Sequence, residues 1–355
     1  MASLKPTFSL TLGALQSTSD NPVGGLRSLI SDRDMAYAAD ALEVELGERG
    51  DVSLGDPATL ELGYEDEREK VFTGTVVELR PTLKGVRVCA LGRMNALLML
   101  RTNGVYEGKT VGQIVQDLLG QADLQEGTIS DGPTLPRFAI DHRCSGYRYV
   151  KDLADRLGYE LYTDREGKVM FHALGAATRA DSAGGALGAA AGAAGGALAG
   201  LAGGGGVGYQ YGKHLIRAEA RRRPASWGKV VVGGESPMSS QGDKSAPWLT
   251  ANEDSNQGSA GEGDATALFI DPAARTKDLA DRFAAGYLST FQRTAYQLST
   301  TVLGRAQVEL GDSISVADVP DSMANGSGYV RAVRHRFGGD TGFLTDLRIV
   351  LEAEE

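Results

Sequence analysis

The sequence predicts an α+β protein that is mainly β, with two β-barrel regions and an α+β insert between them. Segments that alternate apolar and polar residues fill residues 1–104 and return in residues 213–355, while residues 105–173 carry helical patterns and a hairpin. Alternation with period two buries one face of a strand and exposes the other. A chain of 355 residues is too long for one small core, so we expect two or three packed domains.

The first β region is predicted to span residues 1–104. Its expected strands are residues 7–12, 41–46, 59–64, 71–79 and 86–90. Residues 17–25 are rich in Ser, Asn, Pro and Gly and are expected to form a loop. Gly74 interrupts a segment of β-branched residues, which indicates a bulge or a sharp bend.

The α+β insert is predicted over residues 105–173. Thr110 and Gln113 have the spacing of a capping box, and the apolar residues that follow lie on one helical face up to Gly120. A second helix is expected to begin near Ser145 or Gly146 and to end at Gly158. A hairpin should follow directly, with strands at residues 159–162 and 168–171 around a turn at residues 164–167.

Residues 174–212 are predicted to be a Gly/Ala-rich insertion or linker. Residues 182–208 lack charge and are long enough for a membrane span, since a span needs about 20 mainly apolar residues. Gly and Ala contribute little transfer energy, however, and Gly opposes helix formation. We therefore favour a loosely ordered insertion over a membrane-inserting segment and expect no stable membrane anchor.

The second β region is predicted over residues 213–355, with one helix at residues 272–291. Asp271 and Pro272 resemble a helix start, and a polar loop is expected from Glu235 to Asp264. Its expected strands are residues 215–220, 229–234, 296–302, 313–316, 329–333 and 343–351.

Composition and charge argue against several classes of function. The net charge of −10 argues against a nucleic-acid partner, because phosphate binding needs clustered Lys and Arg. The local exception is Arg221–Arg223, which we interpret as a solvated strand end or a subunit contact. Two distant cysteines, Cys89 and Cys144, fit a reducing compartment, and the N-terminus lacks a secretion signal.

The sequence contains no convincing catalytic, cofactor or metal site, and the protein is expected not to be an enzyme. The four histidines are His142, His172, His214 and His335. Only His142 has a cysteine nearby, but two strand positions separate it from the Cys144 backbone by roughly 6.6 Å, which is long for a base and its nucleophile. The carboxylates at residues 65–67 and at Glu262 and Asp264 are expected to be solvated turn residues.

Residues 108–171 resemble the late control D family of baseplate hubs, which includes the N-terminal part of valine-glycine-repeat spike proteins. The resemblance lies in Gly108–Val115, in Tyr147–Tyr162 with its Leu-Gly-Tyr-Glu-Leu-Tyr run, and in Gly167–Val169. Residues 72–76 and 311–316 are similar to short strand motifs that recur in the family's barrels. The order of elements extends the resemblance over nearly the whole chain.

The resemblance implies a structural hub made of two tube-like barrels per subunit, so that three subunits form a pseudo-hexameric ring. Such a ring joins a hexameric inner tube to a trimeric spike of a contractile tail or injection system. The implied partners are a homotrimer, a spike protein, an inner tube or tube-initiator protein and other baseplate proteins. Assembly is expected in the bacterial cytoplasm, with the product a phage tail or injection particle.

The sequence departs from the spike-fusion members because it ends at Glu355 without a β-helix needle, so a separate spike chain is expected. The alternative function is a two-barrel carbohydrate- or protein-binding tail module without an adaptor role. The sequence pattern assigns no residue to the trimer, spike or tube interfaces.

Overall fold

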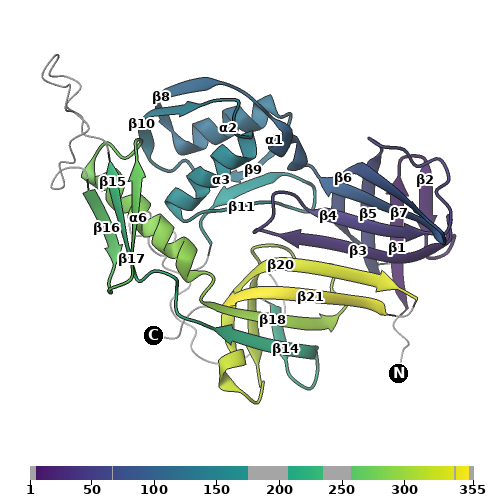
Figure 1. The fold of residues 1–355 in the computed structure, drawn as a ribbon. Coiled ribbons are helices and arrows are strands. Elements are labelled where there is room, and N and C mark those ends of the chain that lie inside the picture. Colours follow the sequence, from purple (N-terminus) through teal and green to yellow (C-terminus); the bar gives the residue numbers. More distant parts are fainter. Residues whose placement is uncertain (1–4, 66, 175–206, 235–256, 340, 352–355) are drawn as a thin grey trace, which may run out of the picture.

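A computed structural model describes residues 5–65, 67–174, 207–234, 257–339 and 341–351. Figure 1 shows two β regions beside an α+β unit, so the protein has the mainly β, two-barrel fold with an insert that the sequence predicts. Most of the predicted insertion and of the polar loop lies outside the described residues.

Seven strands form the first β region. They are β1 (Pro6–Leu12), β2 (Leu15–Thr18), β3 (Leu26–Asp34), β4 (Ala41–Leu46), β5 (Pro57–Tyr64), β6 (Glu67–Thr82) and β7 (Gly85–Gly92). Alternate side chains such as Leu10, Val44 and Leu60 are fully buried in one core, as period-two patterning requires. The strand β3 was not predicted, because its buried side includes the polar residues Ser31 and Arg33.

Gly74 lies at the bend of β6. There it pairs with Ala58 of β5 on one side and with Gly92 of β7 on the other. A Cβ atom at this position would lie 2.2 Å from the carbonyl oxygen of Leu91, so the close approach of β7 requires glycine. The register irregularities of β6 lie between Lys70 and Phe72 and between Val76 and Glu78, so the bulges flank Gly74 and do not include it.

The second β region consists of six strands. They are β13 (Val207–Gln210), β14 (Leu215–Arg222), β18 (Tyr296–Leu303), β19 (Ser313–Ala317), β20 (Gly326–Gly338) and β21 (Gly342–Leu351). Leu298, Val333 and Ile349 are among the residues of its separate core. The strand β13 pairs in parallel with β19, so the expectation of a linker throughout residues 174–212 is wrong at its end.

One continuous sheet connects the two β regions. The strand β20 pairs with β3 from Ala332 opposite Asp34 to Gly338 opposite Ser28. The resulting order is β14-β18-β21-β20-β3-β4-β7-β6-β5-β1-β2. The two barrels therefore share a wall, although most of the chain separates the paired strands.

The insert contains three helices and five strands. They are α1 (Asn95–Met99), β8 (Gly104–Thr110), α2 (Val111–Gln121), β9 (Glu126–Ile129), β10 (Thr134–Ile140), α3 (Gly146–Leu157), β11 (Glu160–Thr163) and β12 (Val169–His172). The capping box at Thr110 and Gln113 is confirmed, as are the Ser145 cap of α3 and its left-handed end at Gly158. The predicted hairpin is β11 and β12.

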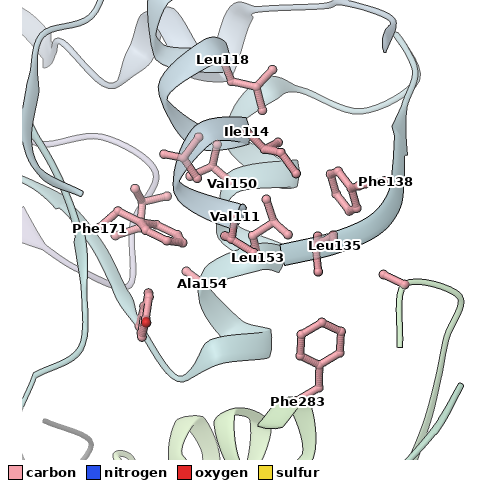
Figure 2. Close-up of a cluster of buried hydrophobic side chains, with 14 of the residues drawn as sticks. Val111, Ile114, Leu118, Leu135, Phe138, Val150, Leu153, Ala154, Phe171 and Phe283 are labelled. Carbon is pink, nitrogen blue, oxygen red and sulfur yellow. The ribbon is translucent and has the colours of Figure 1, made fainter. Parts of the chain in front are cut away.

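The predicted helix of the second β region packs on the insert instead. It is α6 (Lys277–Gln292), and it begins at the Thr276 cap rather than at Pro272. Asp271 ends β17 (Thr266–Asp271), where its carboxylate accepts a hydrogen bond from the Ala273 backbone and so forms a turn. The buried Phe283 of α6 shares one core with Val111, Leu153 and Phe171, as Figure 2 shows.

A small sheet completes this unit. It consists of β16 (Gln257–Gly261), β15 (Lys229–Gly234) and β17, in that order. The start of β16 at Gln257 corrects the predicted extent of the polar loop, Glu235 to Asp264. Val230 and Val232 join the core of the insert, so this part of residues 213–355 does not belong to the second barrel.

Candidate assembly surfaces

The Cys/His pair considered in the sequence lies in the segment that precedes α3. His142 and Cys144 are exposed residues of a turn, not of a strand. The Nδ1 atom of His142 lies 3.2 Å from Oδ1 of Asn103. Within the described ranges, no group of three His, Cys, Asp or Glu residues has the geometry of a metal site.

The other histidines have structural partners. The Nε2 atom of His172 lies 3.1 Å from the Tyr162 hydroxyl, and Nδ1 of His214 accepts a hydrogen bond from the Gln210 backbone. His335 is buried and lies 3.0 Å from the Thr345 hydroxyl. Burial lowers the pKa of His335 to about 3, and Arg33 and Arg165 add to this shift.

The part of the sheet shared by the barrels forms an antiparallel wall of eight strands, β14-β18-β21-β20-β3-β4-β7-β6. Val333 and Leu347 point from one face of this wall into the core, and their neighbours Arg334 and Asp346 lie on the other face. The register places arginines and carboxylates in equal number on that second face. They are Arg80, Arg87, Arg217, Arg221, Arg334, Arg336, Arg348, Asp32, Asp34, Glu43, Glu45, Glu78, Glu219 and Asp346, which together we call the charged face.

Ion pairs run across the charged face. Arg336 lies 2.7 Å from Asp346, Arg348 lies 2.6 Å from Asp34, and Arg334 is paired with Asp32. Arg87 is paired with both Glu43, at 3.1 Å, and Glu45, at 2.6 Å. The hydrogen bond from Arg87 lowers the pKa of Glu45, which keeps that carboxylate ionised.

A groove of about 510 Å³ follows the charged face where β3, β20 and β21 meet. Asp32, Arg334, Arg336, Asp346 and Arg348 line it. Each of these charges already has a partner in the protein, so the groove presents a balanced surface rather than a set of free ligand-binding groups.

The wall has an open edge at each end. Strand β14 pairs with β18 on one side, and the part of β6 beyond Val76 pairs with β7. In the described part of the chain, neither segment has a partner strand on its outer side. The arginine run 221–223 lies at the end of the β14 edge, where Arg221 and Arg222 are the last two residues of the strand. The Arg222 guanidinium lies over the Tyr296 ring.

Buried ion pairs and a buried hydrogen bond hold the insert against the two β regions. Glu160 of β11 is fully buried, 3.0 Å from Arg293 and 3.7 Å from Arg331, and it accepts a hydrogen bond from Tyr329. On the other side, Arg33 of β3 donates to the Thr163 carbonyl at 2.6 Å. These contacts fix the insert relative to the wall.

Sequence reasoning missed the charged face, although a signal was present. Several strands carry charged residues at positions i and i+2, as in Asp32-Arg33-Asp34, Arg334-His335-Arg336 and Asp346-Leu347-Arg348. Such spacing places both charges on one face of a strand. The pairing between strands could not be predicted, because β3 and β20 lie far apart in sequence.

Comparisons with known proteins agree with this architecture. The family described as phage tail baseplate hub (GPD) matches residues 35–341. A 43 kDa tail protein of prophage MuSo2 from Shewanella oneidensis has a TM-score of 0.68 at 14% identity, over 97% of this chain and 98% of that one. A tail protein of Neisseria meningitidis MC58 gives 0.70 at 14% identity, over 97% and 96%.

A third similar structure is the E. coli c3393 protein, described as a component of the type VI secretion system with similarity to T4 bacteriophage tail proteins. Its TM-score is 0.56 at 12% identity, over 97% of this chain and 77% of that one. No curated protein matches the sequence. At these identities the solved structures show a shared fold, and the family match extends over most of the chain, so the chain belongs to the phage tail baseplate hub family.

Proposed function

We propose that this hub protein forms a trimeric, pseudo-hexameric ring that joins a hexameric inner tube to a trimeric spike. The observation that carries the proposal is the eight-strand wall, which consists of two four-stranded halves, β14-β18-β21-β20 and β3-β4-β7-β6. Three copies would supply six such halves. Each subunit would thus present its two four-stranded halves toward a tube with six-fold symmetry. The three subunits would meet the three chains of the spike one to one.

The open edges of the wall support closure of the ring. The β14 edge lies at one end of the wall and the outer part of β6 at the other, so an edge of one subunit can meet the opposite edge of the next. This head-to-tail contact closes into a ring when the rotation between subunits is 120°, and it leaves no strand edge unpaired.

The layers of the subunit support the assignment of one face of the wall to the inside of the proposed ring. The cores of both β regions and the insert lie on the side of Val333 and Leu347. A narrow channel has no room for these layers. The charged face, which the described residues leave uncovered, is therefore assigned to the channel, and the insert to the outside.

The first test is the mass of the purified protein in solution, alone and mixed with a candidate spike chain. A trimer, or a complex of three hub and three spike chains, is the expected result. A stable monomer that binds neither spike nor tube proteins would reject the ring and favour a two-barrel binding module. Assembly in the bacterial cytoplasm, and a structural rather than catalytic role, are parts of the same proposal.

A second test addresses the edges themselves. Strands β14 and β6 run in opposite directions in the wall, so the start of β14 would face the end of β6 in the next subunit. Cysteines introduced by Ile216→Cys and Thr82→Cys, with Cys89→Ser and Cys144→Ser, place one thiol at each of these facing ends. A short bismaleimide should then connect three chains covalently, while each single-cysteine variant should yield no trimer. Cross-linking that is equal in the single variants would contradict the β14-to-β6 contact.

A further inference from the structure

We infer that the charged face is a self-neutralised channel wall, which lets nucleic acid pass through the ring without holding it. This inference rests on the proposed ring. The property concerned is the attraction or repulsion of a polyanion by the charged face, which the ring architecture alone does not determine.

The arginines of the charged face are the groups that could bind the phosphates of a nucleic acid. An unpaired arginine facing a channel would bind phosphate, because each phosphate contact releases counterions and adds to affinity. On this wall carboxylates pair with six of the seven arginines of the charged face, and Arg221 at the end of β14 is the exception among the described residues. Arg336 donates to Asp346 through Nη2 at 2.9 Å, with Nε 2.7 Å from the second oxygen, which is the fork geometry that a phosphate would otherwise use.

Positive and negative side chains are mixed over the charged face. Partners come from adjacent strands, as with Asp32 of β3 and Arg334 of β20, or from the same strand, as with Arg217 and Glu219 at 2.5 Å. Opposite charges therefore alternate over short distances in both directions. Their field cancels within about one Debye length, ~8 Å at physiological salt, so a polyanion on the axis meets neither strong attraction nor strong repulsion.

For the exposed pairs of the charged face, a contribution to folding stability is a weak explanation. Exposed ion pairs contribute only ~0–1 kcal/mol to stability. Arg334, Arg80 and Arg217 are among the paired arginines, and their side chains are 52%, 54% and 71% exposed. Such pairs add little to folding, so their clearest effect is on the charge of the surface.

The test compares two variants of the full-length protein with equal net charge. The variant Asp32→Asn/Asp346→Asn removes the partners of Arg334 and Arg336. The control Glu107→Gln/Glu262→Gln removes two exposed carboxylates that lie away from the wall. Binding of a fluorescent double-stranded DNA is followed by anisotropy at 50 and 150 mM salt, and the mass of each protein is measured in the same buffers.

The wild-type protein and the control should bind DNA weakly and alike. The wall variant should bind at least tenfold more tightly at 50 mM salt and lose most of this gain at 150 mM. Tight binding by the wild type, or equal binding by wall variant and control, would overturn the inference. A monomeric wild type would reject the ring separately, because the mass measurement does not depend on DNA.

Discussion

At the scale of single residues, the most consequential side chain is Glu160. It is fully buried, and the guanidinium groups of Arg293 and Arg331 face it from α6's end and from β20. Removing one member of a buried ion pair leaves an uncompensated charge, which typically costs about 3–5 kcal/mol. We expect Glu160→Ala to lower the free energy of unfolding by that amount in urea denaturation.

The exposed Glu107 provides the control for this experiment. Its replacement by Ala should change the free energy of unfolding by less than about 0.5 kcal/mol, as is usual for surface positions. If Glu160→Ala were as mild as Glu107→Ala, the buried pair would not connect insert and wall energetically.

His335 predicts a pH dependence of stability. Burial lowers the pKa of the folded imidazole to about 3, whereas the unfolded side chain has a pKa near 6.5. Above pH 6.5 both states are neutral and the residue has no effect. Below it the unfolded chain binds a proton that the folded chain does not, so stability falls by up to about 1.4 kcal/mol per pH unit.

The variant His335→Gln keeps a polar partner for Thr345 but cannot be protonated. Urea denaturation between pH 7.5 and 5 should show a smaller loss of stability for this variant than for the wild-type protein. Parallel curves for the two proteins would show that His335 does not remain neutral in the folded state.

At the scale of secondary structure elements, Gly286 determines how closely α6 approaches α3. A Cβ atom there would lie 2.1 Å from the Arg156 carbonyl oxygen at the end of α3. We expect Gly286→Ala to destabilise the protein by roughly 1–3 kcal/mol, as overpacking does, although Ala favours helix formation. Thermal unfolding followed by circular dichroism would measure this.

Gly120 of α2 is the matched position, because a Cβ atom there meets nothing within 4 Å. Gly120→Ala should stabilise the protein by about 0.5–1 kcal/mol through helix propensity alone. An equal gain from both substitutions would mean that the helices do not pack at this contact.

The same elements show how much of the structure could be predicted. The ends of α3 were predictable because Ser145 and Gly158 determine them locally. The start of α6 was not, since Asp271 and Pro272 form a turn that uses the same residue types as a cap. The strand β3 was missed because its buried Arg33 becomes acceptable only through Asp40 and the Thr163 carbonyl, which are tertiary partners.

At the scale of the whole molecule, the open β14 edge predicts the effect of proline. In an antiparallel edge strand, successive backbone N–H groups point alternately toward the neighbouring strand and outward. Proline at an outward position leaves the sheet intact but removes a donor that the proposed contact with a second subunit would use. Of Ala218→Pro and Glu219→Pro, we expect one to keep its melting temperature and lose the trimer, and the other to melt earlier.

Mass measurement and thermal unfolding of both variants would decide this. If each variant stayed trimeric with an unchanged melting temperature, β14 would not be a subunit contact. The pair serves as its own control, because the two positions differ by one residue in the same strand.

The pairing of β3 with β20 also has a consequence for synthesis on the ribosome. Ser28 of β3 is synthesised long before its partner Gly338 of β20. One edge of β3 therefore stays unpaired until nearly the whole chain has left the exit tunnel. A bare strand edge invites pairing with other nascent chains. The charges at Asp32, Arg33 and Asp34 make this edge a poor template for aggregation during that interval. Asp32 and Asp34, which later balance arginines of the wall, therefore also protect the chain before the wall has formed.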